Sequence, residues 1–160
     1  MSNSPAIEAF WRDCVAAVAN LEETTPYTVK VFGRDPEMAE LLLKLVSSGQ
    51  KTGTFGLVWE FEDKGEPLPA VGDWVLVTDY HGQPGCVYQI KSVEIVAFED
   101  MEERHVQCEG PQLRELEPWR QVHWPFWSKM LEGSSHAPDP SMQVVCQTFR
   151  CYYPPLDASN

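Results

Sequence analysis

The hydrophobic pattern of this chain of 160 residues changes its period near Gly49, and this change limits the fold more than any other feature. Before Gly49, most apolar residues recur at the spacing of one helix face. From Thr52 onward they tend to alternate, in short runs separated by turn residues, as antiparallel strands do. We therefore predict an α+β domain in which a small curled antiparallel β-barrel is flanked by helices.

Two helix starts are marked by a capping residue followed by proline, at Ser4-Pro5 and at Asp35-Pro36. The first helix is predicted to run to about residue 22, and the second to Gly49. Residues 94–117 are predicted to form two short helical pieces, and a third long helix is predicted over about residues 116–131. Strands are predicted where β-branched and aromatic residues dominate, over residues 27–32, 52–61, 73–79, 85–98 and 142–153.

The chain is acidic, with 24 Asp and Glu residues against 12 Lys and Arg residues and a net charge of −12. A protein that grips duplex DNA needs a basic face, so duplex DNA is not an expected partner. Residues 94–117 carry eight acidic and two basic residues, which is half of the excess. Screening limits charge effects to about 8 Å at physiological salt, so a local cationic cleft for a nucleoside or single-stranded RNA remains compatible with the net charge.

Five cysteines are scattered without a C-x-x-C pair, and four histidines lack the spacing of metal ligands. This pattern favours reduced thiols in a cytoplasmic protein, with no bound metal and no cofactor. The sequence shows no secretory signal and no apolar run long enough to cross a membrane. We therefore expect no membrane partner.

Lys51 and Thr54 lie where the second helix gives way to the strand-rich part, a place where the rim of a pocket is expected. With alternation from Thr52 onward, the side chains of Thr52 and Thr54 are predicted on the same face. One interpretation is a solvated lysine beside two threonines that favour strands. The other is a threonine nucleophile that is activated by a buried, neutral lysine amine.

Three further residues are candidates for a site. Glu109 is the single acidic residue between Val106 and Leu113, and it is either an exposed turn residue or a proton carrier in a cavity. His123 is either a hydrogen-bonded core residue or a catalytic one. Trp124 lies off the apolar stripe of its helix, where it could line a groove by stacking.

Five segments occur along residues 27–153 in a characteristic order. They are FGRDPEMAELLLKLVSSGQKTGTF, GEPLPAVGDWVLVTDYHGQPGCVYQIKSVEIVAFEDM, HVQCEG, LEPWRQVHWPFW and VVCQTFRCYY. Together with a G-x-K-x-x-T element formed by Gly49, Lys51 and Thr54, they resemble the ASCH domain of the PUA-like superfamily. The resemblance implies a small curled barrel with a cleft for RNA or a nucleoside, preceded by a helical extension (1–26) and followed by a tail (154–160).

Short bacterial members of this superfamily are amidohydrolases that act on N4-acetylcytidine with a lysine, a threonine and a glutamate. The resemblance places these catalytic roles on Lys51, Thr54 and Glu109, the last through its H-x-x-x-E context after His105. The chain departs from those hydrolases by its greater length, its N-terminal helix and the W-R-x-x-H segment of another ASCH branch. It also reads E-G-P-Q-L from Glu109, where many members of that branch read E-G-E-G-D.

Two classes of function are therefore expected. The first is hydrolysis of an N4-acylated cytidine or a similar small amide, with Lys51 as general base, Thr54 as nucleophile and Glu109 holding the exocyclic nitrogen. The second is a non-catalytic module for single-stranded RNA or a flipped base, or a weak single-strand ribonuclease. An RNA surface would need a basic patch from Lys51, Lys91, Arg120 and Lys129. The residues expected to line the cleft are Phe32, Gly49, Thr52, Asp79, Trp119, His123 and Trp124.

Overall fold

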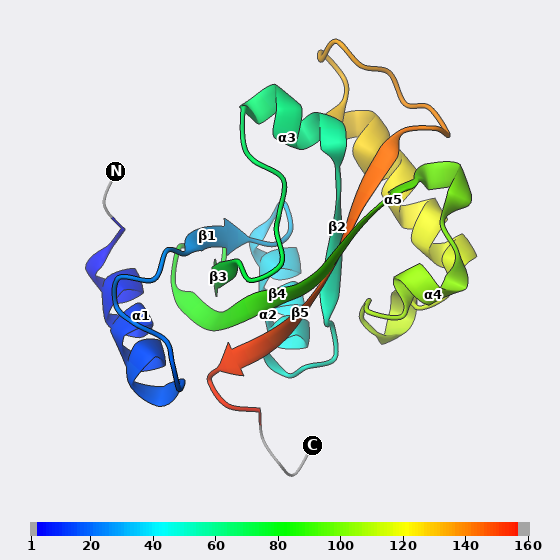
Figure 1. The fold of residues 1–160 in the computed structure, drawn as a ribbon. Coiled ribbons are helices and arrows are strands. Elements are labelled where there is room, and N and C mark those ends of the chain that lie inside the picture. The colour runs from blue at the N-terminus through cyan, green and yellow to red at the C-terminus, as the bar shows by residue number, and fades with distance from the viewer. Residues whose placement is uncertain (1–2, 157–160) are drawn as a thin grey trace.

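The computed structural model describes residues 3–156, which form five strands, five α-helices and two 3₁₀ turns (Figure 1). The strands are β1 (Thr28–Val31), β2 (Gly53–Leu57), β3 (Trp74–Thr78), β4 (Pro84–Ala97) and β5 (Gln143–Tyr153). The helices are α1 (Pro5–Ala17), α2 (Pro36–Ser47), α3 (Val58–Lys64), α4 (Glu103–Val106) and α5 (Leu116–Met130). The 3₁₀ turns are η1 (Phe98–Asp100) and η2 (Pro111–Leu113).

The sheet has the strand order β1-β3-β4-β5-β2, so β1 and β2 are its two edges. The long strands β4 and β5 curl and bend the sheet into a half-barrel (Figure 1). This confirms the predicted α+β fold with a curled sheet and flanking helices. The sheet is mixed rather than wholly antiparallel, because β1 and β3 run parallel. Their connection passes through α2, β2 and α3, which is long enough for a parallel crossover.

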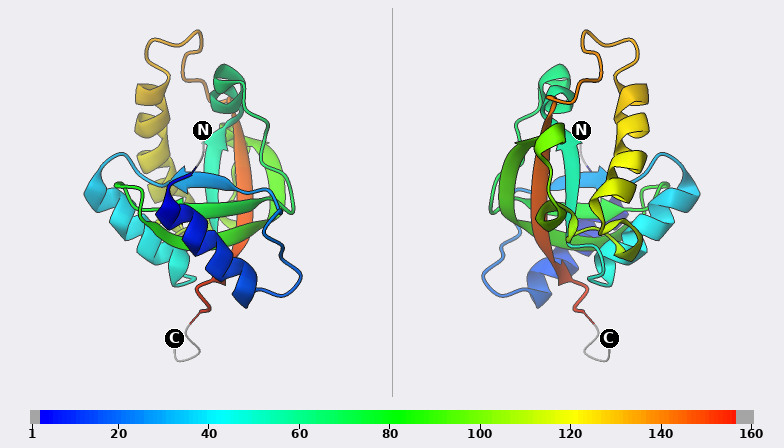
Figure 2. Two further views of the ribbon diagram at one scale, coloured as in Figure 1. Left: turned by 90° about the vertical axis from the view of Figure 1, so that its left-hand side faces the viewer. Right: turned by 90° about the vertical axis from the view of Figure 1, so that its right-hand side faces the viewer.

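Three apolar clusters hold the helices against the sheet. The views in Figure 2 show α1 on one side of the sheet and α5 with α4 on the other. The helix α1 covers Leu76 and Val87, α2 inserts Val46 into the cluster around Tyr88, and α5 buries Trp119 at the far end of the sheet. Within residues 3–156, no helix combines the length and the apolar character that crossing a membrane requires.

Three segments differ from the sequence prediction, each for a physical reason. The strand predicted over 52–61 ends at Leu57, which pairs with Val144 near the start of β5, so the next residues have no partner and form α3. The first helix ends at Ala17 and not near residue 22, and Asn20 just beyond it adopts a left-handed backbone with φ of 65°. Residues 94–97 lie in two overlapping predictions, a strand over 85–98 and a helical piece over 94–117. They extend β4, because β5 is long enough to pair with them, so the strand is confirmed there and the helical start is wrong.

The packing of α1 can be tested at Trp11, which is 3% exposed, stacks on Tyr27 with ring centres 4.1 Å apart and donates to the carbonyl of Glu23. We expect Trp11→Ala to lower the free energy of unfolding by about 3–5 kcal/mol, as measured by urea denaturation. Arg12→Ala, at the exposed neighbouring position, should change it by less than about 0.5 kcal/mol. Equal losses in the two variants would contradict the idea that the buried face of α1 stabilises the fold.

Candidate functional site

Lys51 follows the turn between α2 and β2, where backbone contacts fix the direction of the chain. Gly49 ends α2 in the left-handed conformation, with φ of 81°. The N–H of Lys51 donates to the carbonyl of Leu45 at 2.9 Å, and the N–H of Thr52 donates to the carbonyl of Cys108 at 2.8 Å. Held in this way, the Lys51 side chain points into the protein, and the residue is 5% exposed.

Glu109 reaches the site because the chain after α4 approaches both β2 and α2 closely. A Cβ atom at Gly53 would overlap the side chain of Cys108. A Cβ atom at Gly110 would lie 2.9 Å from Leu45 Cδ1. The contact at Gly53 needs a residue without a side chain, because a Cβ atom there would also overlap the carbonyl oxygen of Gln147, so Gly53 sets how near the Glu109 segment can come.

Arg114 joins the two segments that carry the lysine and the glutamate. Its Nε donates to the carbonyl of Glu109 at 2.8 Å, and its Nη2 donates to the carbonyl of Gln50 at 2.6 Å. Gln50 directly precedes Lys51, so one guanidinium group spans both sides of the site. Sequence reasoning does not select Arg114, because nothing local to it indicates that residues 50 and 109 meet.

The Lys51 amine contacts the Glu109 carboxylate in the protein interior. The two side chains are only 5% and 6% exposed. A buried ion pair adds little net stability, because the loss of hydration offsets the attraction between the charges. The same pair can hold its shared proton in two ways, as ammonium with carboxylate or as neutral amine with carboxylic acid. It therefore brings a base and an acid to one place.

Thr54 lies on β2, three residues after Lys51, and pairs with Gln147 of β5. Thr54 is 7% exposed, so this residue is largely shielded from water. Thr52 is exposed instead, in a groove of about 340 Å³ that Glu94 also lines. Thr52 and Thr54 thus occupy different environments.

His123 on α5 presents a hydrogen-bond acceptor to the same region. Its Nδ1 lies 2.8 Å from the carbonyl oxygen of Trp119, which can only accept, so Nδ1 carries the hydrogen. The ring stacks on Trp119 at 4.3 Å. Burial lowers the pKa of His123, and the opposing charges of Glu109 and Lys51 both act on it. His123 is therefore neutral near pH 7, and the lone pair of Nε2 remains free to accept.

Lys30 on β1 is a second lysine that is partly buried and that sequence reasoning does not select. Val29 and Val31 on either side of it are 39% and 41% exposed, whereas Phe32 is 6% exposed on the inner face. Lys30 shares that inner face, and its Nζ lies 4.7 Å from the centre of the Phe32 ring. Burial lowers the pKa of Lys30 to about 8, with a smaller effect of the Lys51 charge in the same direction and an opposing one from carboxylates. The sequence signal that could have identified Lys30 is its place on the inward face of an alternating strand.

The other residues predicted to line the cleft serve other purposes. Phe32 and Trp119 are core residues, at 6% and 0% exposure. Trp124 packs on Phe98 with ring centres 5.2 Å apart. Asp79 accepts two backbone N–H groups in the turn between β3 and β4, both at 2.9 Å. It also lines a separate cavity of about 470 Å³ between that turn and α2. Asp79 and Trp124 thus each contact partners other than Lys51 and Glu109.

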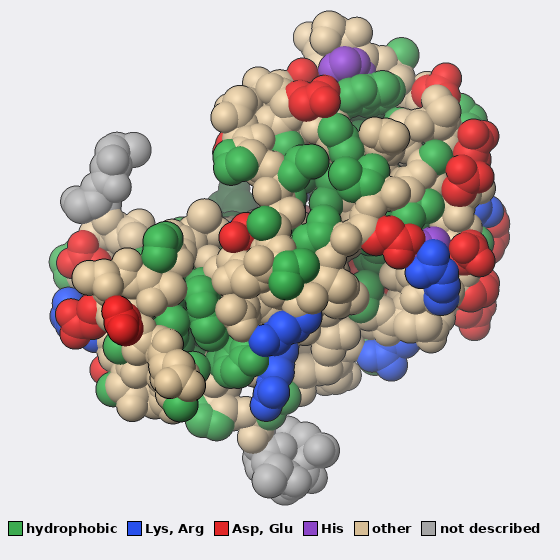
Figure 3. Space-filling view, viewed as in Figure 1, with side chains coloured by type: hydrophobic (Ala, Val, Ile, Leu, Met, Phe, Trp, Pro, Cys, Tyr) green, Lys and Arg blue, Asp and Glu red, His purple; other side chains and the backbone are tan. Residues whose placement is uncertain are grey.

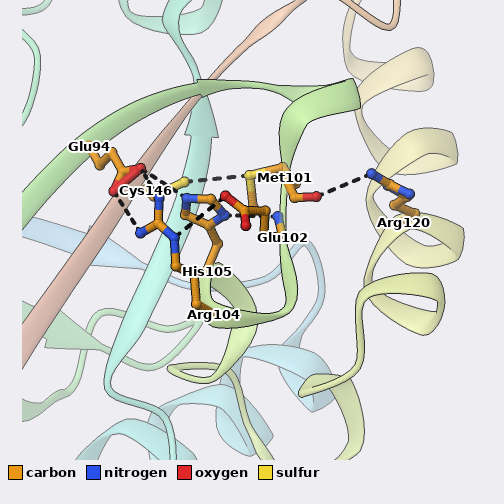
Figure 4. A network of polar contacts seen from close by, with 7 residues as sticks. All are labelled: Glu94, Met101, Glu102, Arg104, His105, Arg120 and Cys146. Atoms are coloured by element: carbon orange, nitrogen blue, oxygen red, sulfur yellow. Dashed lines mark hydrogen bonds and ion pairs between the residues drawn. The ribbon is translucent and has the colours of Figure 1, made fainter.

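A polar network behind Glu109 fixes α4 to β4 (Figure 4). His105 Nδ1 accepts the N–H of Glu102 at 2.9 Å, so its Nε2 carries the hydrogen and donates to Glu94 at 2.9 Å. Arg104 makes two contacts with the same carboxylate, at 3.0 and 3.2 Å, and the hydrogen bonds from Arg104 and His105 lower the pKa of Glu94. In the H-x-x-x-E spacing, His105 therefore positions α4, and Glu109 follows four residues later.

Hydrophobic side chains gather in the middle of the face that Figure 3 shows. Acidic side chains lie along the flank of α4 and α5, beside several basic ones, and others lie over α1 and near α3. Basic side chains gather over β4 and β5, where Lys91 and Arg150 each lie 4.9 Å from the ring of Tyr152. The predicted patch does not form, because Lys51 is buried and Arg120 donates to backbone carbonyls beside α5.

The half-barrel with its covering helices and the buried Lys51–Glu109 contact define the class of domain. A family model described as the ASCH domain matches residues 28–153. An ASCH domain from Lactobacillus crispatus JV V101 superposes with a TM-score of 0.86 at 23% identity, over 96% of this chain and 98% of that chain. A DUF984 protein from Enterococcus faecalis V583 gives a TM-score of 0.80 at 28% identity, over 92% and 90% of the two chains. No curated protein sequence matched.

Because the family model covers most of the chain, the protein belongs to the ASCH domain family. This confirms the resemblance and the PUA-like fold that the sequence indicated. The comparisons identify the domain and leave its ligand and its chemistry to be proposed from the site.

The Lys51–Glu109 contact can be tested by a double-mutant cycle. Lys51→Met is expected to lower the free energy of unfolding by about 3–5 kcal/mol, because it leaves the Glu109 carboxylate buried without its partner. The double variant Lys51→Met/Glu109→Leu should recover most of this loss, since no charge remains buried. Urea denaturation of the wild type, both single variants and the double variant measures the coupling. Additive effects of the two substitutions would show that the groups do not interact.

Proposed function

We propose that this ASCH domain binds a nucleoside around Lys51 and hydrolyses an N4-acylated cytidine or a similar small amide. The proposal rests on the buried contact between Lys51 and Glu109. Thr54, three residues further along the chain, is itself buried and adds a hydroxyl group. An amine, a carboxyl group and a hydroxyl are the groups that acyl transfer from a small amide uses.

One shared proton lets the pair act as base and acid in turn. With that proton on Glu109, the neutral Lys51 amine accepts the proton of Thr54 Oγ1 as this oxygen attacks the acyl carbon. Glu109 then protonates the exocyclic nitrogen as the C–N bond breaks, so that cytidine leaves and an acyl-threonine ester remains. In the second half, water attacks the ester carbon and gives its proton to Glu109. Lys51 returns its proton to Thr54, and the free acid is released.

The burial of the pair supports this sequence of steps, because a site that excludes bulk water strengthens the interactions between its polar groups. The neutral His123 adds an acceptor at Nε2 for an N–H group of the base. The ring of Phe55 on β2 lies beside that of His123, with the ring centres 5.9 Å apart.

The hydrolytic role is tested by incubating the protein with N4-acetylcytidine and separating the released cytidine by chromatography. Thr54→Val keeps the shape of the side chain and removes the nucleophile, so we expect kcat to fall by about 10³-fold or more. Thr24→Val, an exposed threonine in the loop after α1, is the matched control and should keep wild-type kcat. Unchanged turnover in Thr54→Val would overturn the assignment of the nucleophile.

A second candidate function, binding of single-stranded RNA, is favoured by a different surface. Tyr152 lies between Lys91 and Arg150, and its ring centre is 5.3 Å from that of Trp74. Aromatic rings flanked by cations suit a stacked base with its phosphates. This surface lies on the strands β3, β4 and β5, so it does not depend on Lys51 or Thr54.

Fluorescence anisotropy of a short labelled single-stranded RNA at two salt concentrations tests this candidate. Tyr152→Ala should weaken binding about tenfold, because stacking contributes about 1–3 kcal/mol per base. Tyr80→Ala, a 48% exposed tyrosine in the turn between β3 and β4, is the control and should bind as the wild type does. Absence of binding at low salt would contradict the candidate. Shortening of the labelled RNA would reveal the weak ribonuclease activity that the sequence analysis considered.

A further inference from the structure

The short segment between Glu109 and α5 turns back on itself. Pro111 is the first residue of the turn η2, and its ring fixes the backbone angle φ close to the value that a 3₁₀ turn needs. The N–H of Leu113 closes the turn by donating to the carbonyl of Gly110 at 3.0 Å. Arg114 caps the turn, and its Nε donates to the carbonyl of Glu109 at 2.8 Å. The turn therefore directs the guanidinium group back to the residue that carries the site carboxylate.

The same guanidinium group also holds the chain on the lysine side. Nη2 of Arg114 donates to the carbonyl of Gln50 at 2.6 Å, and Gln50 is joined directly to Lys51. The N–H donors of an arginine lie in one rigid plane, so bonds from two of its nitrogens fix two acceptors relative to each other. A single half-buried side chain thus sets how the carbonyl groups of residues 50 and 109 lie.

Lys51 lies between two links to the segment that carries Glu109. The residue before it accepts a hydrogen bond from Arg114, and the residue after it donates its N–H to the carbonyl of Cys108 at 2.8 Å. One link alone leaves two segments free to pivot about it, whereas two links also fix their direction. A buried ion pair needs such support, because the loss of hydration offsets the attraction between its charges.

The backbone of Arg114 is itself held in place. Gln107 Nε2 donates to the carbonyl of Arg114 at 2.9 Å and to the carbonyl of Glu103 on α4 at 2.8 Å. The carboxylate of Glu103 accepts the N–H of Leu116 at the start of α5, with both oxygens at 3.2 Å. Arg114 is therefore tied to two helices before its side chain reaches the site. Such support from surrounding hydrogen bonds is what keeps a functional group in a defined position.

We propose that Arg114 is the positioning residue of the Lys51–Glu109 pair. It acts through the two backbone carbonyl groups and keeps the amine and the carboxyl group within reach of one proton. The consequence for turnover rests on the proposed function, whereas the consequence for the pair itself does not. Misplacing reacting groups by about 1 Å can cost about 10²-fold in rate, so a residue of this kind matters without touching the ligand.

The proposal is tested by measuring the coupling between Lys51→Met and Glu109→Leu in two backgrounds, the wild type and Arg114→Met. Methionine keeps much of the length of the arginine side chain and removes its donors. Urea denaturation should show that the coupling falls by about half or more in Arg114→Met. Arg34→Met is the matched control, because it removes a guanidinium group that donates to a distant carbonyl, that of Phe126 at 3.1 Å. It should keep the wild-type coupling. An unchanged coupling in Arg114→Met would overturn the proposal.

The conservative variant Arg114→Lys provides a second test. Its donors lie on one nitrogen and cannot reproduce the planar fork that spans two carbonyl groups. The coupling in Arg114→Lys should therefore lie between the values for the wild type and for Arg114→Met. This variant decides alone if Arg114→Met does not fold, and a coupling equal to that of the wild type would then contradict the role of Arg114.

Turnover of N4-acetylcytidine separates this role from a contact with the ligand. In Arg114→Met, kcat should fall by about ten- to a hundredfold while KM stays within about twofold of the wild type. A rise in KM with unchanged kcat would instead assign Arg114 to ligand binding and refute a positioning role. Absence of hydrolysis in the wild type would contradict the proposed function, and the coupling measurement would still decide on Arg114. Hydrolysis together with an unchanged coupling would contradict the role of Arg114 alone.

Discussion

The contact between Lys51 and Glu109 is the constraint on which the arrangement of the site depends. It joins two positions 58 residues apart in the sequence, at a depth where water cannot solvate either charge. Burying both charges costs more free energy than the attraction between them restores. The packing on either side must therefore stabilise it. The core around Val46 supports α2 on one side of Lys51, and the core around Val106 supports α4 on the side of Glu109.

The sheet is an open half-barrel, because the edge strands β1 and β2 do not pair with each other and the sheet does not close on itself. One side chain bridges the rim, because Arg34 after β1 donates to the carbonyl of Phe126 on α5 at 3.1 Å and stacks on its ring at 4.0 Å.

Local features of the fold were predictable because local chemistry determines them. The cap at Asp35 was predicted from one residue and the proline after it, and its carboxylate does accept the N–H of Met38 at 2.8 Å. The helix α3 was missed because its sequence can also alternate as a strand does. The choice between strand and helix depends on β5, which begins too late to pair with residues beyond Leu57. This information lies in a distant part of the chain.

The site shows the same division between local and long-range information. The pairing of Lys51 with Glu109 was anticipated through family resemblance, since no spacing in one sequence indicates that two such residues meet. Arg114, Gly53 and Gly110 escaped notice because their roles exist only when the segments around residues 50 and 109 are adjacent. Asp79 illustrates the local kind of information. An aspartate in a tight turn satisfies the backbone of that turn, which is a local purpose.

The two candidate surfaces place different demands on an acidic protein, and the distribution of charge separates them. The flank of α4 and α5 carries the excess of acid and would repel a long nucleic acid strand lying across it (Figure 3). A small, weakly charged ligand is little affected by that repulsion, because screening confines it to about 8 Å at physiological salt. A strand, in contrast, is best accommodated over β4 and β5, where Lys91 and Arg150 lie together. The net charge thus favours a small, weakly charged ligand at Lys51 and confines any longer strand to the basic surface around Tyr152.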